Sequence, residues 1–178
     1  ANELFGLNYI VFRPHNVFGE GQNIGDKYRN VIGIFMNQLL QNKPLTVYGN
    51  GQQTRAFSYI DEVAPYMADA VTIKDAYNQV FNIGNDKQYS LNELAVEVMA
   101  VMDKKMPIHY LEARKEVQHA YANHDKMKKV FQMPNQNTII TDGLYKMSQW
   151  VKVHGARKTK KFNAIEIEQG LPENWKNI

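Results

Sequence analysis

Cysteine is absent from this chain of 178 residues, which excludes disulfide bonds, a catalytic thiolate and a zinc site built from thiolates. A chain without cysteine is compatible with a reducing compartment, and we expect a cytoplasmic protein. Long apolar runs are also missing, because none approaches the roughly 20 residues that a membrane helix needs. We therefore expect no membrane partner.

The chain also lacks a strong charge of either sign. Its 21 basic and 18 acidic residues leave a net charge of only +3, and the basic residues gather mainly in 104–129 and 157–161. Such a balance does not favour binding to nucleic acid or to an anionic membrane surface. We expect no nucleic-acid partner, although the basic segment 157–161 leaves open a non-catalytic interaction module.

Several common site patterns are missing as well. The five histidines lie in separate segments, and only His119 and His124 are close, at a spacing that does not place both on one helical face. The loop with Gly19 and Gly21 is not a dinucleotide-binding G-x-G-x-x-G, because Ile24 stands where the third glycine is required. There is no G-x-S-x-G nucleophile motif either. We expect no metal site, and we identify no catalytic residue in this chain.

Hydrophobic patterning predicts an α/β fold with short strands and about five helices. Apolar or β-forming runs predict strands at 7–12, 45–48, 80–83 and 107–111, the first of them buried. Apolar residues at helical spacing predict helices at 28–42, 61–71, 91–102, 124–132 and 141–154. In the second of these, Val63, Tyr66, Met67, Ala70 and Val71 are expected to face inward.

Local signals mark the ends of these elements. Ser90 and Glu93 form a capping-box pattern, and Asp61 is expected to cap the second helix. Residues 1–5 are typical of a last helical turn that Gly6 ends. We therefore expect the chain to begin inside an element and to be a fragment of a longer protein.

Two arginines stand out as candidate ligand-binding residues. Arg55 and Arg114 each follow a short strand and precede a helix-forming segment. Guanidinium groups bind phosphate through two parallel hydrogen bonds, so the pair could hold a diphosphate. The alternative is a surface salt bridge for each arginine, which would contribute little.

Taken together, several segments resemble a known family. They are 13–19 (R-P-H-N-V-F-G), 47–63 (V-Y-G-x-G-x-x-x-R-x-F-x-Y-I-D-x-V), 81–84 (F-N-I-G), and Arg114, Val117, Pro134 and Gly143-Leu144. In this order they resemble the C-terminal half of extended short-chain dehydrogenase/reductase enzymes that act on nucleotide sugars, most of all the UDP-glucose 4-epimerase type. The resemblance extends from residue 1 to about residue 150.

The resemblance implies a Rossmann-type enzyme that uses NAD, takes a UDP-sugar as substrate and forms a homodimer at full length. It implies that 1–154 is the nucleotide-sugar-binding C-terminal domain, with 1–19 the end of the Rossmann half, and that 155–178 is a tail. Neither the GxxGxxG motif nor the catalytic YxxxK pair of such enzymes is present. We therefore expect an isolated fragment that is inactive and does not bind NAD tightly. A 4,6-dehydratase or a decarboxylase of the same family is the alternative.

The resemblance also implies roles for individual residues. Pro14 and His15 are expected near the nicotinamide, and Asn16 near the sugar or diphosphate. The residues expected to bind the rest of the substrate are Asn30, Val31, Thr46, Val47, Tyr48, Arg55 and Arg114. The chain departs from the family at Ala56, where aspartate is common, and at Lys115-Glu116, where Gly-Asp is common.

Overall fold

The structure, a computed structural model, describes residues 2–26, 30–132 and 139–158. Its helices are α1 (Asn2–Phe5), α2 (Val31–Leu40), α3 (Ala64–Asp69), α4 (Leu91–Met102), α5 (Asp125–Phe131) and α6 (Ile140–His154), with 3-10 turns η1 (Ile60–Glu62), η2 (Ala70–Thr72) and η3 (Lys74–Ala76). Its strands are β1 (Ile10–Pro14), β2 (Val17–Phe18), β3 (Leu45–Tyr48), β4 (Thr54–Ala56), β5 (Ser58–Tyr59), β6 (Gln79–Ile83), β7 (Gln88–Ser90), β8 (Ile108–Leu111) and β9 (His119–Ala120). Pro134 and the expected tail beyond residue 158 lie outside the described residues.

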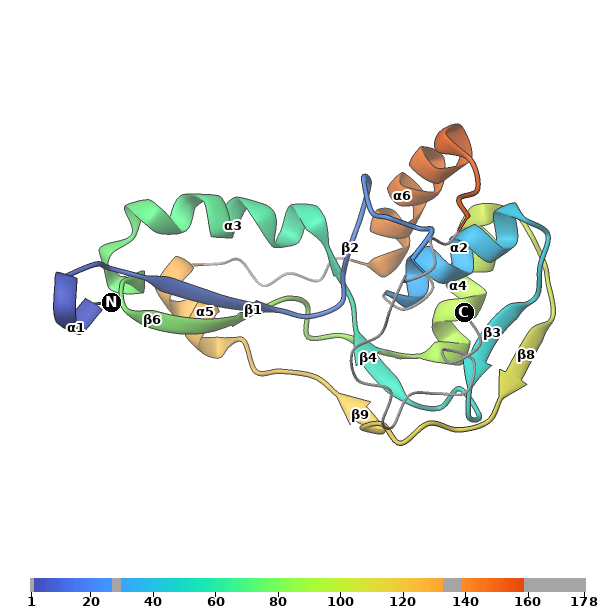
Figure 1. Ribbon diagram of the computed structural model, residues 1–178, viewed down its shortest axis with the longest axis horizontal. Coiled ribbons are helices and arrows are strands. Elements are labelled where there is room, and N and C mark those ends of the chain that lie inside the picture. The colour runs from blue at the N-terminus through green and yellow to red at the C-terminus, as the bar shows by residue number, and fades with distance from the viewer. Residues whose placement is uncertain (1, 27–29, 133–138, 159–178) are drawn as a thin grey trace.

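One end of the molecule, the strand lobe, consists of β1, β6, α3 and α5 (Figure 1). β1 and β6 pair in parallel from Ile10 with Gln79 to Pro14 with Ile83. A core that includes Phe81, Ile83 and Met127 joins the sheet to its helices. The carboxyl ends of the two strands therefore lie side by side, which is where open α/β sheets bind ligands.

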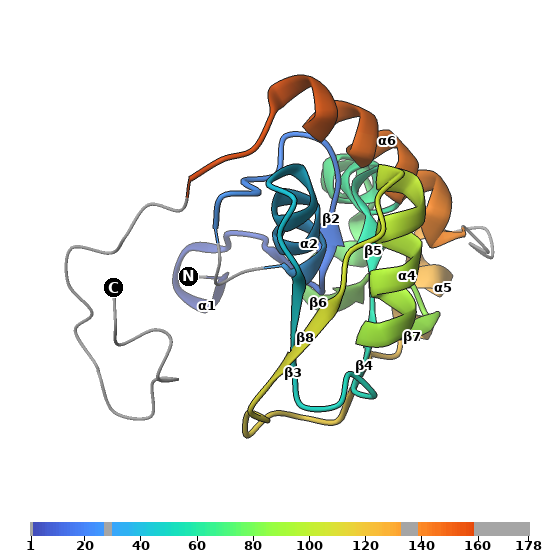
Figure 2. The ribbon, with the colours of Figure 1, turned by 90° about the vertical axis from the view of Figure 1, so that its right-hand side faces the viewer.

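The other end, the helix lobe, consists of α2, α4 and α6 with the parallel strands β3 and β8 (Figures 1 and 2). Most apolar residues that the helical periodicity places inward, among them Phe35, Leu94 and Leu144, are fully buried here, whereas others, such as Val31 and Leu91, are partly buried. Ser90 accepts a hydrogen bond from the Glu93 amide, and the Glu93 side chain accepts one from the Ser90 amide. The predicted capping box is thus confirmed.

β4 lies between the two lobes in Figure 1. It pairs antiparallel with β7 and parallel with β9, so Arg55 is opposite Tyr89 on one side and Ala120 on the other. β5, which follows β4 directly in sequence, pairs in parallel with β2. Segments far apart in the chain are thereby brought to the arginine.

The first strand differs from the prediction of a buried strand at 7–12. β1 begins at Ile10, Leu7 is 62% exposed and Val11 is 41% exposed, whereas Ile10 and Phe12 pack against the core. Successive side chains of a strand point to opposite faces, and the described helices cover one face of β1. The apolar run at 7–12 therefore forms a strand of which only one face is buried.

Two expectations about the second helix are also wrong. Asp61 lies within η1 rather than at a helix N-cap, and Val63 occupies the N-cap position of α3. Val63 and Ala70 are buried as expected, but Met67 is 39% and Val71 is 68% exposed. The α-helix ends at Asp69 and continues as the 3-10 turn η2, whose tighter winding changes the direction of the later side chains.

Among the described helices, none is long and apolar enough to cross a membrane. The described residues also contain no group of three or more potential metal ligands.

Candidate functional site

The start of α2 is shaped by an asparagine. Asn30 has a positive φ of 48° and caps the helix, because its side-chain oxygen accepts a hydrogen bond from the Ile32 amide at 3.2 Å. Its amide nitrogen donates to the Val17 carbonyl at 2.6 Å. Val31 is the first residue of the helix, whose amino end carries partial positive charge.

Asn16 ties the loop after β1 to the end of β4. Its φ is 44°, a left-handed conformation that asparagine tolerates better than most residues. Its side chain donates to the Ala56 carbonyl at 2.9 Å, and its own carbonyl accepts from the Ser58 amide at 3.3 Å. Asn16 therefore lies beside the strand that carries Arg55.

Arg55 is held by groups from two segments. Its guanidinium forms an ion pair with Glu116 at 2.8 Å and donates to the carbonyls of Thr54 at 2.8 Å and Gln118 at 3.3 Å. Its side chain is only 17% exposed, so the guanidinium group is oriented before any ligand binds. An arginine fixed in this way loses little conformational freedom when it binds an anion.

Arg114 lies against the aromatic ring of Tyr48, with 3.3 Å between the guanidinium carbon and the ring centroid. Gln53 connects this pair to Arg55, because its amide nitrogen donates to the Tyr48 carbonyl at 2.8 Å and to Glu116 at 3.2 Å. We refer to Tyr48, Gln53, Arg55, Arg114 and Glu116 as the arginine cluster. It offers two cations, a carboxylate and an aromatic face in one place.

The two residues before Tyr48 have structural contacts. The side chain of Gln38 bonds both the hydroxyl of Thr46 at 2.8 Å and its amide at 3.3 Å. Val47 is 1% exposed and packs in the core of the helix lobe. Any ligand contact of Val47 must therefore use its backbone.

A second polar group lies at the carboxyl ends of β1 and β6. Pro14 is the last residue of β1, and the ring of His15, which follows it, stacks on His124 with centroids 4.9 Å apart. His124 bonds Asp86 at 2.6 Å, and Asp86 also bonds Lys128. We call His15 and His124 the histidine stack.

Burial, followed by the neighbouring His124 ring, lowers the pKa of His15 from its ordinary value of 6.5. Burial acts to raise the pKa of Asp86, but the hydrogen bonds from Lys128 and His124 outweigh it and lower that pKa. Asp86 is thus ionised at neutral pH, and His15 is neutral.

Most of the expected site residues lie in two separate groups rather than in one. Asn16, Tyr48, Arg55 and Arg114 lie in or beside the arginine cluster, whereas Pro14 and His15 lie at the strand ends. Sequence reasoning missed other participants, namely Gln53, Ser58, Asp86 and His124, and noted Glu116 only as a departure. The position of Asp86 just after a strand was a usable signal; no local pattern points to the others.

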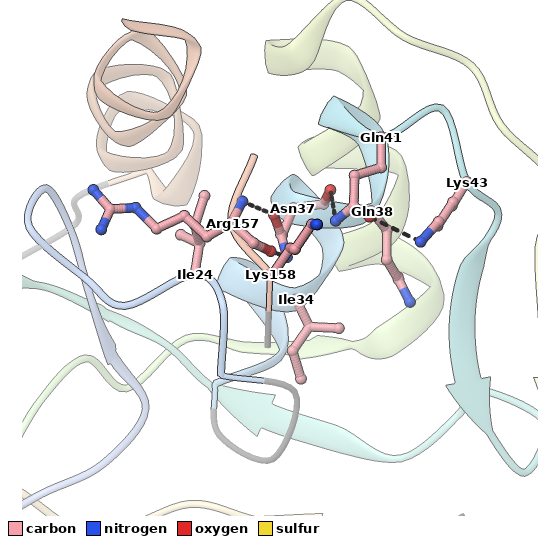
Figure 3. Close-up of a pocket in the computed structure, with 8 residues that line it drawn as sticks. All are labelled: Ile24, Ile34, Asn37, Gln38, Gln41, Lys43, Arg157 and Lys158. Atoms are coloured by element: carbon pink, nitrogen blue, oxygen red, sulfur yellow. Dashed lines mark hydrogen bonds between the residues drawn. The ribbon is translucent and has the colours of Figure 1, made fainter. Parts of the chain in front are cut away.

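A pocket of about 310 Å³ lies elsewhere, beside α2 (Figure 3). Its wall includes Gln38, Lys43 and Lys158, and the side chain of Asn37 closes one part of it by bonding the backbone N–H and C=O of Arg157, both at 2.9 Å. Asn37 is therefore buried. None of the pocket's lining residues is an expected substrate or cofactor contact.

The described part of the chain has an α/β fold of the Rossmann-type dehydrogenase and epimerase class. Residues 1–84 match the model of the NAD dependent epimerase/dehydratase family.

Relatives of known name agree with this class. A Methanocaldococcus jannaschii protein whose name assigns it provisionally to the UDP-glucose 4-epimerases is 39% identical over 93 residues, which are 52% of this chain and 29% of that protein. GDP-mannose 3,5-epimerase of Arabidopsis thaliana is 28% identical over 93% of this chain and 44% of its own length. UDP-N-acetyl-alpha-D-glucosaminuronate decarboxylase of Bacillus cytotoxicus is 27% identical over 96% and 46%.

Solved structures show the same fold. The UDP-N-acetylglucosamine 4-epimerase of Methanobrevibacter ruminantium, in complex with UDP-N-acetylmuramic acid, aligns with a TM-score of 0.75 and 25% identity over 86% of this chain and 49% of that one. An epimerase of Methanothermobacter thermautotrophicus aligns with a TM-score of 0.80 at 21% identity. The chain thus spans about half the length, or less, of the proteins it matches.

Proposed function

We propose that this chain is the substrate-binding part of an NAD-dependent nucleotide-sugar epimerase of the UDP-glucose 4-epimerase type. The observation that carries the proposal is the arginine cluster, in which Arg55 and Arg114 are joined through Gln53 and Glu116. A diphosphate requires fixed cations, and both guanidinium groups are held by neighbours from other segments. These are also the two arginines that the family resemblance assigns to the diphosphate.

The other expected contacts extend from this cluster. Asn16 is bonded to the residue after Arg55, and Asn30 is bonded to the residue after Asn16. The amino end of α2, at Asn30 and Val31, therefore offers backbone N–H groups to the same anion. We assign Tyr48 and the backbone of Thr46 and Val47 to the base pocket.

NAD, when bound, would accept a hydride from the sugar and return it. Pro14 and His15 fit its nicotinamide end, because Nδ1 of His15 is buried without a hydrogen-bond partner at the end of a parallel strand, where a ligand N–H could bond it. No residue pattern in this sequence would hold the dinucleotide phosphates. Nucleotide binding at the arginine cluster would position the sugar for both hydride steps.

Relatives with other activities keep a second candidate open. A GDP-mannose epimerase and a sugar-nucleotide decarboxylase both match most of this chain. We therefore retain a dehydratase or decarboxylase of the same family as the alternative.

Binding of UDP-glucose to the purified chain tests the proposal by isothermal titration calorimetry. Replacing Arg55 with glutamine removes a charge-assisted contact worth about 1.5–3 kcal/mol, so affinity should fall about tenfold to a hundredfold. Arg157→Gln, whose position lies beside the α2 pocket, is the matched control and should leave affinity unchanged.

Equal affinity in wild type and Arg55→Gln would contradict the assignment of the diphosphate site. Salt-sensitive binding of RNA or DNA without any UDP-glucose binding would instead favour an interaction module. Turnover of a UDP-hexose by this chain alone would contradict the expectation that it is inactive by itself.

A further inference from the structure

The histidine stack has no role in the proposed diphosphate site, yet it lies at the strand ends where the proposed function puts the nicotinamide. His124 comes from the start of α5, 109 positions after His15, and its side chain is only 2% exposed. The two rings are nearly parallel, with an angle of 13° between their planes. A buried histidine in such contact with another is unusual enough to require a physical reason.

The hydrogen bonds determine which nitrogen of each ring carries the proton. Nε2 of His15 faces the carbonyl oxygen of Asn85 at 3.4 Å, and a carbonyl can only accept, so this nitrogen donates. Nδ1 of His124 faces the ionised carboxylate of Asp86 and donates in the same way. The remaining nitrogens, Nδ1 of His15 and Nε2 of His124, are buried without hydrogen-bond partners. With its proton on Nε2, the neutral His15 ring leaves Nδ1 as an acceptor.

One long hydrogen bond is a weak constraint on the His15 ring, because good N–H···O bonds are about 2.9–3.0 Å. The ring is held further by its surroundings. Its edge lies against Gly84, where an added Cβ would come within 2.5 Å of Cε1 of His15, and its face lies on His124. His124 is itself anchored, because Asp86 holds it and is held in turn by Lys128.

We propose that His124 is a positioning residue, whose aromatic face fixes the orientation and the tautomer of His15 at the carboxyl end of β1. The consequence for the cofactor rests on the proposed function, because it is there that His15 faces the nicotinamide. A fixed tautomer keeps Nδ1 of His15 available as an acceptor for a ligand N–H. The positioning itself requires no ligand.

The charged and titratable groups around His15 fit this role. α5 contributes Lys128 along with His124 at its N-cap, the loop after β6 contributes Asp86, and η1 contributes Glu62, which bonds the side chain of Asn85 at 3.4 Å. Protonation of His15 would create a buried N–H that lacks an acceptor and would place a positive charge against the neighbouring ring. The stack therefore favours a neutral His15 ring.

Nuclear magnetic resonance of ¹⁵N-labelled histidine in the ligand-free chain tests the inference. In the wild type at pH 8, His15 should show a single tautomer with the proton on Nε2. His124→Ala removes the ring on which His15 stacks, so the signals of His15 should average between two tautomers. His124→Phe keeps an aromatic face and should restore the single tautomer. His109→Ala, in an exposed strand of the helix lobe, is the control and should leave His15 unchanged.

A single Nε2-protonated tautomer in a folded His124→Ala variant would overturn the proposal, as would averaging in a folded His124→Phe variant. If the alanine variant does not fold, His124→Leu, which fills the same space without an aromatic face, decides the question. The signals of His15 should average in this variant, and a single Nε2-protonated tautomer would overturn the proposal. These measurements do not depend on UDP-glucose binding, so they can fail or succeed independently of the proposed function.

Discussion

At the scale of single residues, the arginine cluster depends on geometry as much as on charge. Arg114 lies 3.3 Å from the ring centre of Tyr48, a distance at which the flat guanidinium covers the aromatic face. Arg55 is oriented by a carboxylate and by two backbone carbonyls. A lysine could supply the same charge at either position but not the planar fork.

Arg114→Lys therefore distinguishes shape from charge. We expect this variant to bind UDP-glucose about tenfold more weakly than the wild type, a loss of about 1.4 kcal/mol, because the ammonium cannot both stack on Tyr48 and bond two phosphate oxygens. Calorimetry measures the affinity, and Lys115→Arg, a change of the same kind at the next residue, is the control. Unchanged affinity in Arg114→Lys would show that charge alone is sufficient.

At the scale of elements, α6 packs so closely on the strand β5 that a glycine is required. An added Cβ at Gly143 would come within 2.8–2.9 Å of Cβ, Cγ and Cδ2 of Tyr59. These atoms lie near the tyrosine backbone and cannot move away easily. The close packing of α6 on β5 therefore requires a residue without a Cβ atom at position 143.

Gly143→Ala should destabilise the protein by about 1–3 kcal/mol, although the same change in an exposed helix interior usually stabilises it. Gly33→Ala in α2 is the matched control, because its added Cβ would meet chiefly the end of the flexible Gln22 side chain, which can shift. Urea unfolding measures both variants. An equal or higher midpoint for Gly143→Ala would contradict the close packing of α6 on β5.

The capping box of α4 gives a second prediction at this scale. Ser90→Ala removes the acceptor for the Glu93 amide and should lower the free energy of unfolding by about 1 kcal/mol. Glu93→Gln keeps a side chain that can bond the Ser90 amide and should cost less. If chemical denaturation shows an equal loss for both variants, the reciprocal bonding is not what stabilises the start of this helix.

At the scale of the whole molecule, the buried His15 makes stability depend on pH. Its folded-state pKa lies below 6.5, so the unfolded chain binds more protons than the folded one as the pH falls below that value. The contribution to stability is complete above pH 6.5 and is lost progressively as the pH falls towards the folded-state pKa. The histidine stack links α5 to the end of β1, so this loss bears on the strand lobe.

We expect the free energy of unfolding to be lower at pH 5.5 than at pH 7.5. His15→Phe keeps an aromatic ring that does not titrate and should reduce this difference, whereas the exposed His109→Ala should retain it. Urea titrations at the two pH values provide the measurement. A wild-type protein that is equally stable at both would contradict the burial of a neutral His15.

Much of the secondary structure was predictable, because periodicity and caps are local properties. The strand at 80–83 corresponds to β6, the helix at 141–154 to α6, and Gly6 ends α1 with a φ of 63°. The site was predictable only in part. Arg55 and Arg114 were singled out from their positions after strands, but their connection through Gln53 was not, because no local pattern links residues 59 positions apart.

By itself, the sequence determined most of the helices, the strands that correspond to β3, β6 and β8, and the capping box. These follow from intervals of two to four residues, over which side chains interact along one element. Only the tertiary structure decided that Glu116 pairs with Arg55, that His124 stacks on His15 and that Val71 is exposed. The physical reason is that such contacts depend on which strands are neighbours and where each helix ends, and both are set by packing across the whole chain.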